Sequence, residues 1–110
     1  MEKLNIYQKY IQEILSGYYD HDRHPNTSQL IFDTERNHYQ LLSLGWRGEF
    51  KRICDIIAHV DIIDGKIWVQ RDFTEPSITD QLVERGVPNT DIVLGFHPPY
   101  KRPFTEFAVQ

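Results

Sequence analysis

The stretch HVDIIDGKIWVQ, residues 59–70, decides the fold of this chain. Its centre, Asp64-Gly65, separates two runs of alternating residues, and this arrangement is the strongest short-range signal of a β-hairpin. A two-residue loop with both residues at positive φ places Ile63 opposite Lys66 and so predicts the register. The expected pairs are Val60 with Val69 and Ile62 with Ile67 on the core face, and Asp61 with Trp68 and His59 with Gln70 on the other face.

The two strands of this hairpin extend outward from the loop. The first is predicted over Ile53–Ile63 and the second over Lys66–Asp72. Because side chains alternate along a strand, the first strand presents every second residue to the core. The residues expected there are Cys54, Ile56, Ala58, Val60 and Ile62, which makes Cys54 a buried small hydrophobe.

Two more strands are predicted before this hairpin. Alternation with a period of two indicates Leu30–Glu35 and His38–Arg47, joined by a turn at Glu35–Asn37. A further turn around Gly48 leads into the next strand, so all neighbouring strands are expected to be antiparallel. The residues expected on one face of the second strand are Leu42, Leu44 and Trp46.

Helices are predicted on either side of these strands. Helical spacing of apolar residues indicates a first helix over residues 3–19, followed by a polar loop over residues 20–28. A second helix is predicted over residues 75–85, with Thr74 as its N-cap, Pro76 in its first turn and Gly86 ending it. The remaining segments are a short connection over Val87–Phe96, an irregular proline-rich tail over residues 97–103, and Phe104–Val109 as a candidate for a last short strand.

This order predicts a single domain that spans residues 1–110. Its class is α+β and two-layered: an antiparallel four- to five-stranded sheet with an N-terminal helix and a second helix before an extended C-terminal tail. With 40% hydrophobic residues, the chain can bury one compact core. We expect a cytoplasmic location, because no stretch approaches the roughly 20 apolar residues of a membrane span and the single cysteine permits no internal disulfide.

The clearest polar constellation is His59 with Asp61 on one face of a strand, with Trp68 beside them. Such a face can form a polar pocket or a metal site, or equally a surface that meets solvent or another protomer. A structural zinc site needs four ligands, and the sequence contains no cysteine pair and no His-x₃-His spacing. We therefore predict no catalytic residue, no metal and no cofactor.

A second constellation combines basic and aromatic residues in the tail, where Lys101 and Arg102 follow Tyr100. Such residues can grip nucleic acid or anchor a protein interface. The net charge of −4 opposes DNA binding and favours the protein interface. We also expect a homo-oligomer that uses Trp46, Trp68 or the tail as its contact surface. The candidate partner-binding or pocket residues are Trp46, His59, Asp61, Trp68, His97, Tyr100, Lys101 and Arg102.

Several stretches together resemble the XisI family. They are FDTERNHYQL at residues 32–41, Gly45-Trp46, HVDI at 59–62, DGKIWVQ at 64–70, Thr74-Glu75, GVP at 86–88 and DIVLGFHPPYKR at 91–102. The last of these is the most specific. The resemblance runs over nearly the whole chain, and the segment near residues 20–28 has no feature to align.

The resemblance implies a controlling factor for excision of the fdxN DNA element, a rearrangement during heterocyst differentiation in filamentous cyanobacteria. It implies a companion protein, XisH, which looks like an endonuclease-type fold, and a separate site-specific recombinase, XisF. It supplies no catalytic residues. Two readings follow: a non-enzymatic accessory protein that binds the XisH-type companion, or a DNA-binding directionality factor. A third is an uncharacterised enzyme that uses the face formed by His59, Asp61 and Trp68.

Overall fold

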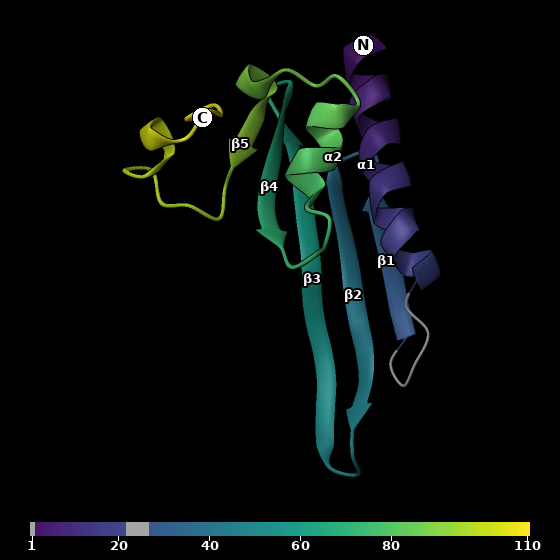
Figure 1. The fold of residues 1–110 in the computed structure, drawn as a ribbon. Coiled ribbons are helices and arrows are strands. Elements are labelled where there is room, and N and C mark those ends of the chain that lie inside the picture. Colours follow the sequence, from purple (N-terminus) through teal and green to yellow (C-terminus); the bar gives the residue numbers. More distant parts are fainter. Residues whose placement is uncertain (1, 22–26) are drawn as a thin grey trace.

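The computed structural model describes residues 2–21 and 27–110, and its elements form two layers, with α1 and α2 on one face of a five-stranded sheet (Figure 1). The class is the α+β fold that the sequence predicts. The helices and strands are α1 (Glu2–His21), β1 (Thr27–Asp33), β2 (His38–Arg47), β3 (Lys51–Ile63), β4 (Lys66–Asp72), α2 (Ile78–Glu84) and β5 (Ile92–Leu94), with short 3₁₀ turns at Asn89–Asp91 and Arg102–Phe104.

The strands follow one another across the sheet in chain order, β1-β2-β3-β4-β5. The first four are antiparallel, as predicted, but β5 runs parallel to β4. The expected short connection over Val87–Phe96 therefore contains the fifth strand, which is buried at all three positions. Phe104–Val109, the candidate for that strand, contributes only an isolated bridge between Ala108 and Val93.

The core lies between the sheet and the two helices. Tyr39, Val60 and Val69, from three neighbouring strands, are fully buried there. They pack in one cluster with Ile11 of α1 and Leu82 of α2, so the apolar stripe of each helix covers this face. We call it the covered face and the opposite side of the sheet the open face.

The central hairpin has the predicted turn. Asp64 and Gly65 both have positive φ, 52° and 79°. Ile63 pairs with Lys66, and Asp61 pairs with Trp68. The register that the Asp-Gly dipeptide predicts is therefore confirmed next to the loop.

A β-bulge in β3 changes the prediction further from the loop. Leu41 pairs with Ala58 but Leu42 pairs with Ile56, so Ile57 is an extra residue. An extra residue reverses the alternation beyond it. Cys54 is consequently exposed rather than buried, and Ile53 takes the buried position. The prediction that Cys54 and Ile56 line the core was wrong for this reason.

A second bulge lies in β4, where Val60 pairs with Val69 but His59 pairs with Arg71. Gln70 is the extra residue, and the predicted pairing of His59 with Gln70 was wrong. Beyond the bulge, Asp72 pairs with Ala58, which lies on the covered face, so the Asp72 side chain is on the covered face too. The Asp72 carboxylate there accepts a hydrogen bond of 2.8 Å from the backbone N–H of Ile78.

The second helix begins later than predicted. Its N-cap is Ser77, whose hydroxyl accepts a hydrogen bond from the N–H of Asp80, so Thr74 and Pro76 lie before the helix. Gly86, with φ of 94°, follows its end as expected. The first helix includes the predicted range and extends slightly beyond it at both ends, and the first strand begins and ends a few residues earlier than predicted. The centre of the predicted loop, residues 22–26, lies outside the described residues.

Beyond their pairing with β1 and β4, strands β2 and β3 continue together as a two-stranded arm, residues 45–53, which projects from the rest of the molecule (Figure 1). The helices do not cover this part of the hairpin. Among the described helices, none is long and apolar enough to cross a membrane.

Candidate functional site

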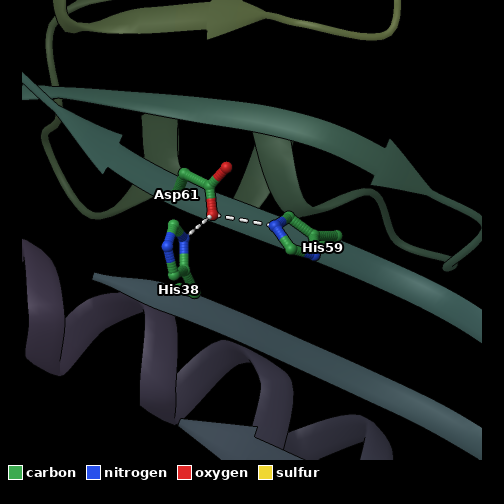
Figure 2. A group of neighbouring side chains, drawn as sticks. All are labelled: His38, His59 and Asp61. Atoms are coloured by element: carbon green, nitrogen blue, oxygen red, sulfur yellow. Dashed lines mark hydrogen bonds and ion pairs between the residues drawn. The ribbon is translucent and has the colours of Figure 1, made fainter. Parts of the chain in front are cut away.

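Three side chains converge on the open face, at the ends of β2 and β3 that lie opposite the tip of the arm: His38 from β2, and His59 and Asp61 from β3 (Figure 2). His38 Nδ1 lies 2.7 Å from Asp61 Oδ1, and His59 Nε2 lies 2.8 Å from the same oxygen. His38 pairs with Asp61 across the two strands, and His59 precedes Asp61 by two residues on the same face. We call these three residues the His-Asp cluster.

Two glutamines hold the cluster from outside. The amide nitrogen of Gln40 lies 2.7 Å from His59 Nδ1, and the amide of Gln70 donates a hydrogen bond of 3.2 Å to Asp61 Oδ2. With neutral imidazoles, His38 Nδ1–H and His59 Nε2–H donate to Asp61, and His59 Nδ1 accepts from Gln40. Every named polar atom then has a partner, as burial requires.

The members of the cluster differ in their access to solvent. The Asp61 side chain is 11% exposed, whereas that of His38 is 52% exposed. Asp61 lies on the face of the sheet that the helices do not cover, and it is the neighbouring side chains that shield its carboxylate from water. Three donors around a nearly buried carboxylate give a rigid, preorganised group of nitrogen and oxygen atoms, with the imidazole of His38 on the solvent side.

Sequence reasoning identified His59, Asp61 and Trp68 on this face and missed His38. The bulge at Ile57 explains the omission. If the pairing of Arg47 with Lys51 at the tip of the arm continued without a bulge, Asn37 would face Asp61. The extra residue moves the pairing by one position and brings His38 to the carboxylate.

The other predicted site residues lie apart from the cluster or at its border. Trp68 pairs with Asp61, and the guanidinium of Arg102 lies 5.1 Å from its ring centroid. Arg102 also donates to the carbonyl oxygen of His97, at 3.0 Å, so these three predicted residues meet where the tail folds back. Arg102 thus holds the tail, while Tyr100 is 71% exposed. Lys101 is exposed beside it.

At Gly95 the backbone passes close to the side chains of Gln70 and Trp68, a contact that the sequence did not indicate. A Cβ atom there would lie 2.3 Å from the side-chain oxygen of Gln70 and 3.2 Å from a ring carbon of Trp68. The absence of a side chain at Gly95 therefore gives Gln70 room beside the cluster. This position links the tail to the carboxylate through one glutamine.

Trp46 lies on the arm, away from the cluster but on the same face of β2 as His38, because both occupy even positions of a regular strand. Its ring lies 5.1 Å from the guanidinium of Arg52. On this face of β2, the apolar residues Leu42 and Leu44 lie between Trp46 and Gln40. They belong to a band that we call the apolar stripe, with the members Ile31, Leu42, Leu44, Trp46, Cys54 and Ile56.

The comparison with known families settles the relationship of this chain. The model of the XisI protein family matches residues 1–109. The chain belongs to the XisI family. The resemblance in the sequence is thereby confirmed.

Solved structures agree with the family assignment. A crystal structure of a XisI-like protein from Anabaena variabilis ATCC 29413 is 44% identical, with a TM-score of 0.91 over 97% of this chain and 99% of the other. A crystal structure of the fdxN element excision controlling factor XisI from the same organism is 43% identical, with a TM-score of 0.87 over 98% of this chain and 99% of the other. Among curated proteins, no match was found.

Proposed function

We propose that this protein is a non-enzymatic controlling factor for excision of a DNA element, acting in the cytoplasm through contact with a XisH-type companion protein. Family membership supports a role in excision control, since a 43% identical structure is that of an fdxN element excision controlling factor. A XisF-type recombinase is a second candidate partner, to be tested in the same way.

The observation that carries the proposal is the apolar stripe. Ile31, Trp46 and Ile56 are 48%, 49% and 39% exposed, and Leu42 and Leu44 between them are half-buried. Contiguous exposed apolar surface marks a protein contact site rather than a site for phosphate groups. A projecting two-stranded arm also reaches a partner without disturbing the core.

Charge supports a protein partner over DNA. Phosphate neutralisation supplies most non-specific affinity for DNA, and the chain has a net charge of −4. Tryptophan in a desolvated contact is among the residues whose truncation costs the most binding energy. We therefore propose Trp46 as the centre of the companion contact and the exposed Tyr100 and Lys101 of the tail as a second contact.

The test is isothermal titration of the purified chain with the XisH-type companion encoded in the same genome. Trp46→Ala should weaken the complex by at least about tenfold. Phe73→Ala, which truncates an aromatic residue that is 70% exposed outside the stripe, is the matched control and should leave affinity unchanged. Tyr100→Ala reports whether the tail contributes. A complex that tolerates both Trp46→Ala and Tyr100→Ala would overturn the proposed contacts, and failure to bind the companion would overturn the adaptor role.

The alternative is a directionality factor that binds DNA directly. Arg47, Lys51 and Arg52 lie at the exposed tip of the arm, and a two-stranded ribbon can enter a DNA groove. Titration with a labelled excision-site duplex separates the two functions. The adaptor predicts weak binding with a shallow salt dependence, whereas submicromolar binding with a slope near −0.9 per neutralised phosphate would favour the directionality factor.

A further inference from the structure

We infer that the His-Asp cluster is a binding site for one divalent transition-metal ion, with Zn²⁺ as the foremost candidate. The ligand atoms are His38 Nδ1, His59 Nε2 and Asp61 Oδ1, which all lie within 4.8 Å of one another. Two of the three separations are 2.7 and 2.8 Å. The inference concerns a site that the proposed role in excision control does not require.

The distances allow an ion to enter with small side-chain movements. Bonds of about 2.0–2.2 Å in a tetrahedral arrangement place ligand atoms roughly 3.3–3.5 Å apart. His38 and His59 must each move away from Asp61 by about half an ångström and approach one another. Their backbones need not move, because the pairing of β2 with β3 already brings the three side chains to one point.

The chemistry of the ligands selects the metal. Two imidazole nitrogens and one carboxylate oxygen suit Zn²⁺, Co²⁺, Ni²⁺ or Fe²⁺, whereas Ca²⁺ and Mg²⁺ prefer sites made of oxygen atoms. Three protein ligands leave at least one coordination position for water or for a partner's side chain. This position faces the solvent side, where His38 is half exposed.

The surrounding glutamines fit the metal-bound state as well as the free one. Metal binding requires imidazoles whose N–H groups sit on the nitrogen away from the ion. The proton of His38 then sits on Nε2 and that of His59 on Nδ1, and the amide of Gln40 turns over, so that its oxygen accepts where its nitrogen donated. Gln70 keeps its hydrogen bond to Asp61 Oδ2, the oxygen that the ion does not use.

The experiment is calorimetric titration of the chelator-treated, untagged full chain with ZnCl₂. We expect one ion per chain, and no comparable binding of CaCl₂ or MgCl₂. His38→Ala should weaken Zn²⁺ binding by at least about 100-fold, and Gln40→Ala by about tenfold. His97→Ala, the same substitution at a histidine outside the cluster, is the matched control and should bind like the wild type.

Two further measurements make the result decisive. Thermal unfolding checks that His38→Ala folds, and Asp61→Asn, which retains the shape of the side chain, should abolish one-to-one binding as well. Nitrogen-15 NMR of the imidazoles should show Zn²⁺ on Nδ1 of His38 and Nε2 of His59. The inference is overturned if the wild type binds no stoichiometric ion, or if binding persists unchanged in His38→Ala, in which case the cluster is only a hydrogen-bonded network.

Discussion

The two faces of the sheet are built from the same strands by different means. On the covered face, Tyr39, Val60 and Val69 are fully buried against helices, and their contribution is apolar area removed from water. On the open face, Asp61 is nearly as buried, but directed hydrogen bonds hold it in place. The comparison teaches that one face depends on apolar side chains of suitable shape, whereas the other depends on particular polar atoms.

The largest expected effect comes from truncating the covered face. Ile67 is fully buried there. The substitution Ile67→Ala should lower the free energy of unfolding by about 2–5 kcal/mol, because the cavity that it leaves adds to the lost transfer free energy. Ile31→Ala makes the same change on the open face, where the residue is 48% exposed, and should cost less than about 1 kcal/mol. Chemical denaturation measures both, and equal losses would contradict the distinction between the faces.

A smaller effect is expected from the carboxylate of the open face. Asp61→Ala leaves the donors of His38, His59 and Gln70 without their acceptor and should cost about 1–3 kcal/mol. Asp55→Ala, on the exposed part of β3, is the matched control and should change stability by less than about 0.5 kcal/mol. If both variants unfold at the same denaturant concentration, the cluster adds nothing to stability.

A pH effect tests a polar contact between the helical layer and the sheet. Asp91, just before β5, accepts hydrogen bonds from Tyr7 at 2.6 Å and Lys3 at 2.8 Å. Partial burial alone would raise the pKa of Asp91, but the bonds from Lys3 and Tyr7 outweigh it, and the net pKa lies below the usual value. The contact therefore stabilises the fold at neutral pH.

That stabilisation should disappear as the pH falls from the ordinary carboxyl range, near 4, through the lowered pKa of folded Asp91. Tyr7→Phe should reduce the loss of stability on acidification, because removing this hydrogen bond brings the pKa of Asp91 in the folded chain closer to its pKa in the unfolded chain. Tyr10→Phe, a tyrosine on the same helix whose ring lies near Arg85, serves as the control. Unfolding curves recorded between neutral pH and pH 3 measure the slopes, and identical slopes for wild type and Tyr7→Phe would refute the account.

The smallest effect on stability is expected on the open face of the arm, where Trp46 is 49% exposed. Trp46→Ser should cost less than about 1 kcal/mol, chiefly the contact with Arg52. The same change should reduce the self-association that we predict from the exposed aromatic residues. Light scattering at micromolar concentration measures this, and a wild type that is wholly monomeric would refute the predicted oligomer.

The covered face near the central loop could be predicted from the sequence, because Asp64-Gly65 specifies a register and alternation then places Val60, Ile62, Ile67 and Val69. The open face could be predicted only in part. His59 and Asp61 share one strand, but His38 of β2 lies opposite Asp61 because Ile57 is left unpaired between Ile56 and Ala58, and no sequence signal marks that bulge. β5 was missed because three apolar residues are too short to distinguish a strand from a connection.

The bulge at Ile57 also affects the direction in which the arm projects, independently of which side chains the arm presents on each face. A bulged strand bends, and the tip near Phe50 lies about 23 Å further along at roughly 3.3 Å per residue. A change of a few degrees at this hinge point thus moves the tip by ångströms. If Ile57 were deleted, Ile56 would directly precede Ala58, and the two would still point to opposite faces of the sheet. Every cross-strand pair between β2 and β3 should therefore persist, including His38 with Asp61. Ile57 therefore sets the direction of the arm, whereas other residues form the surface that the arm presents to a partner.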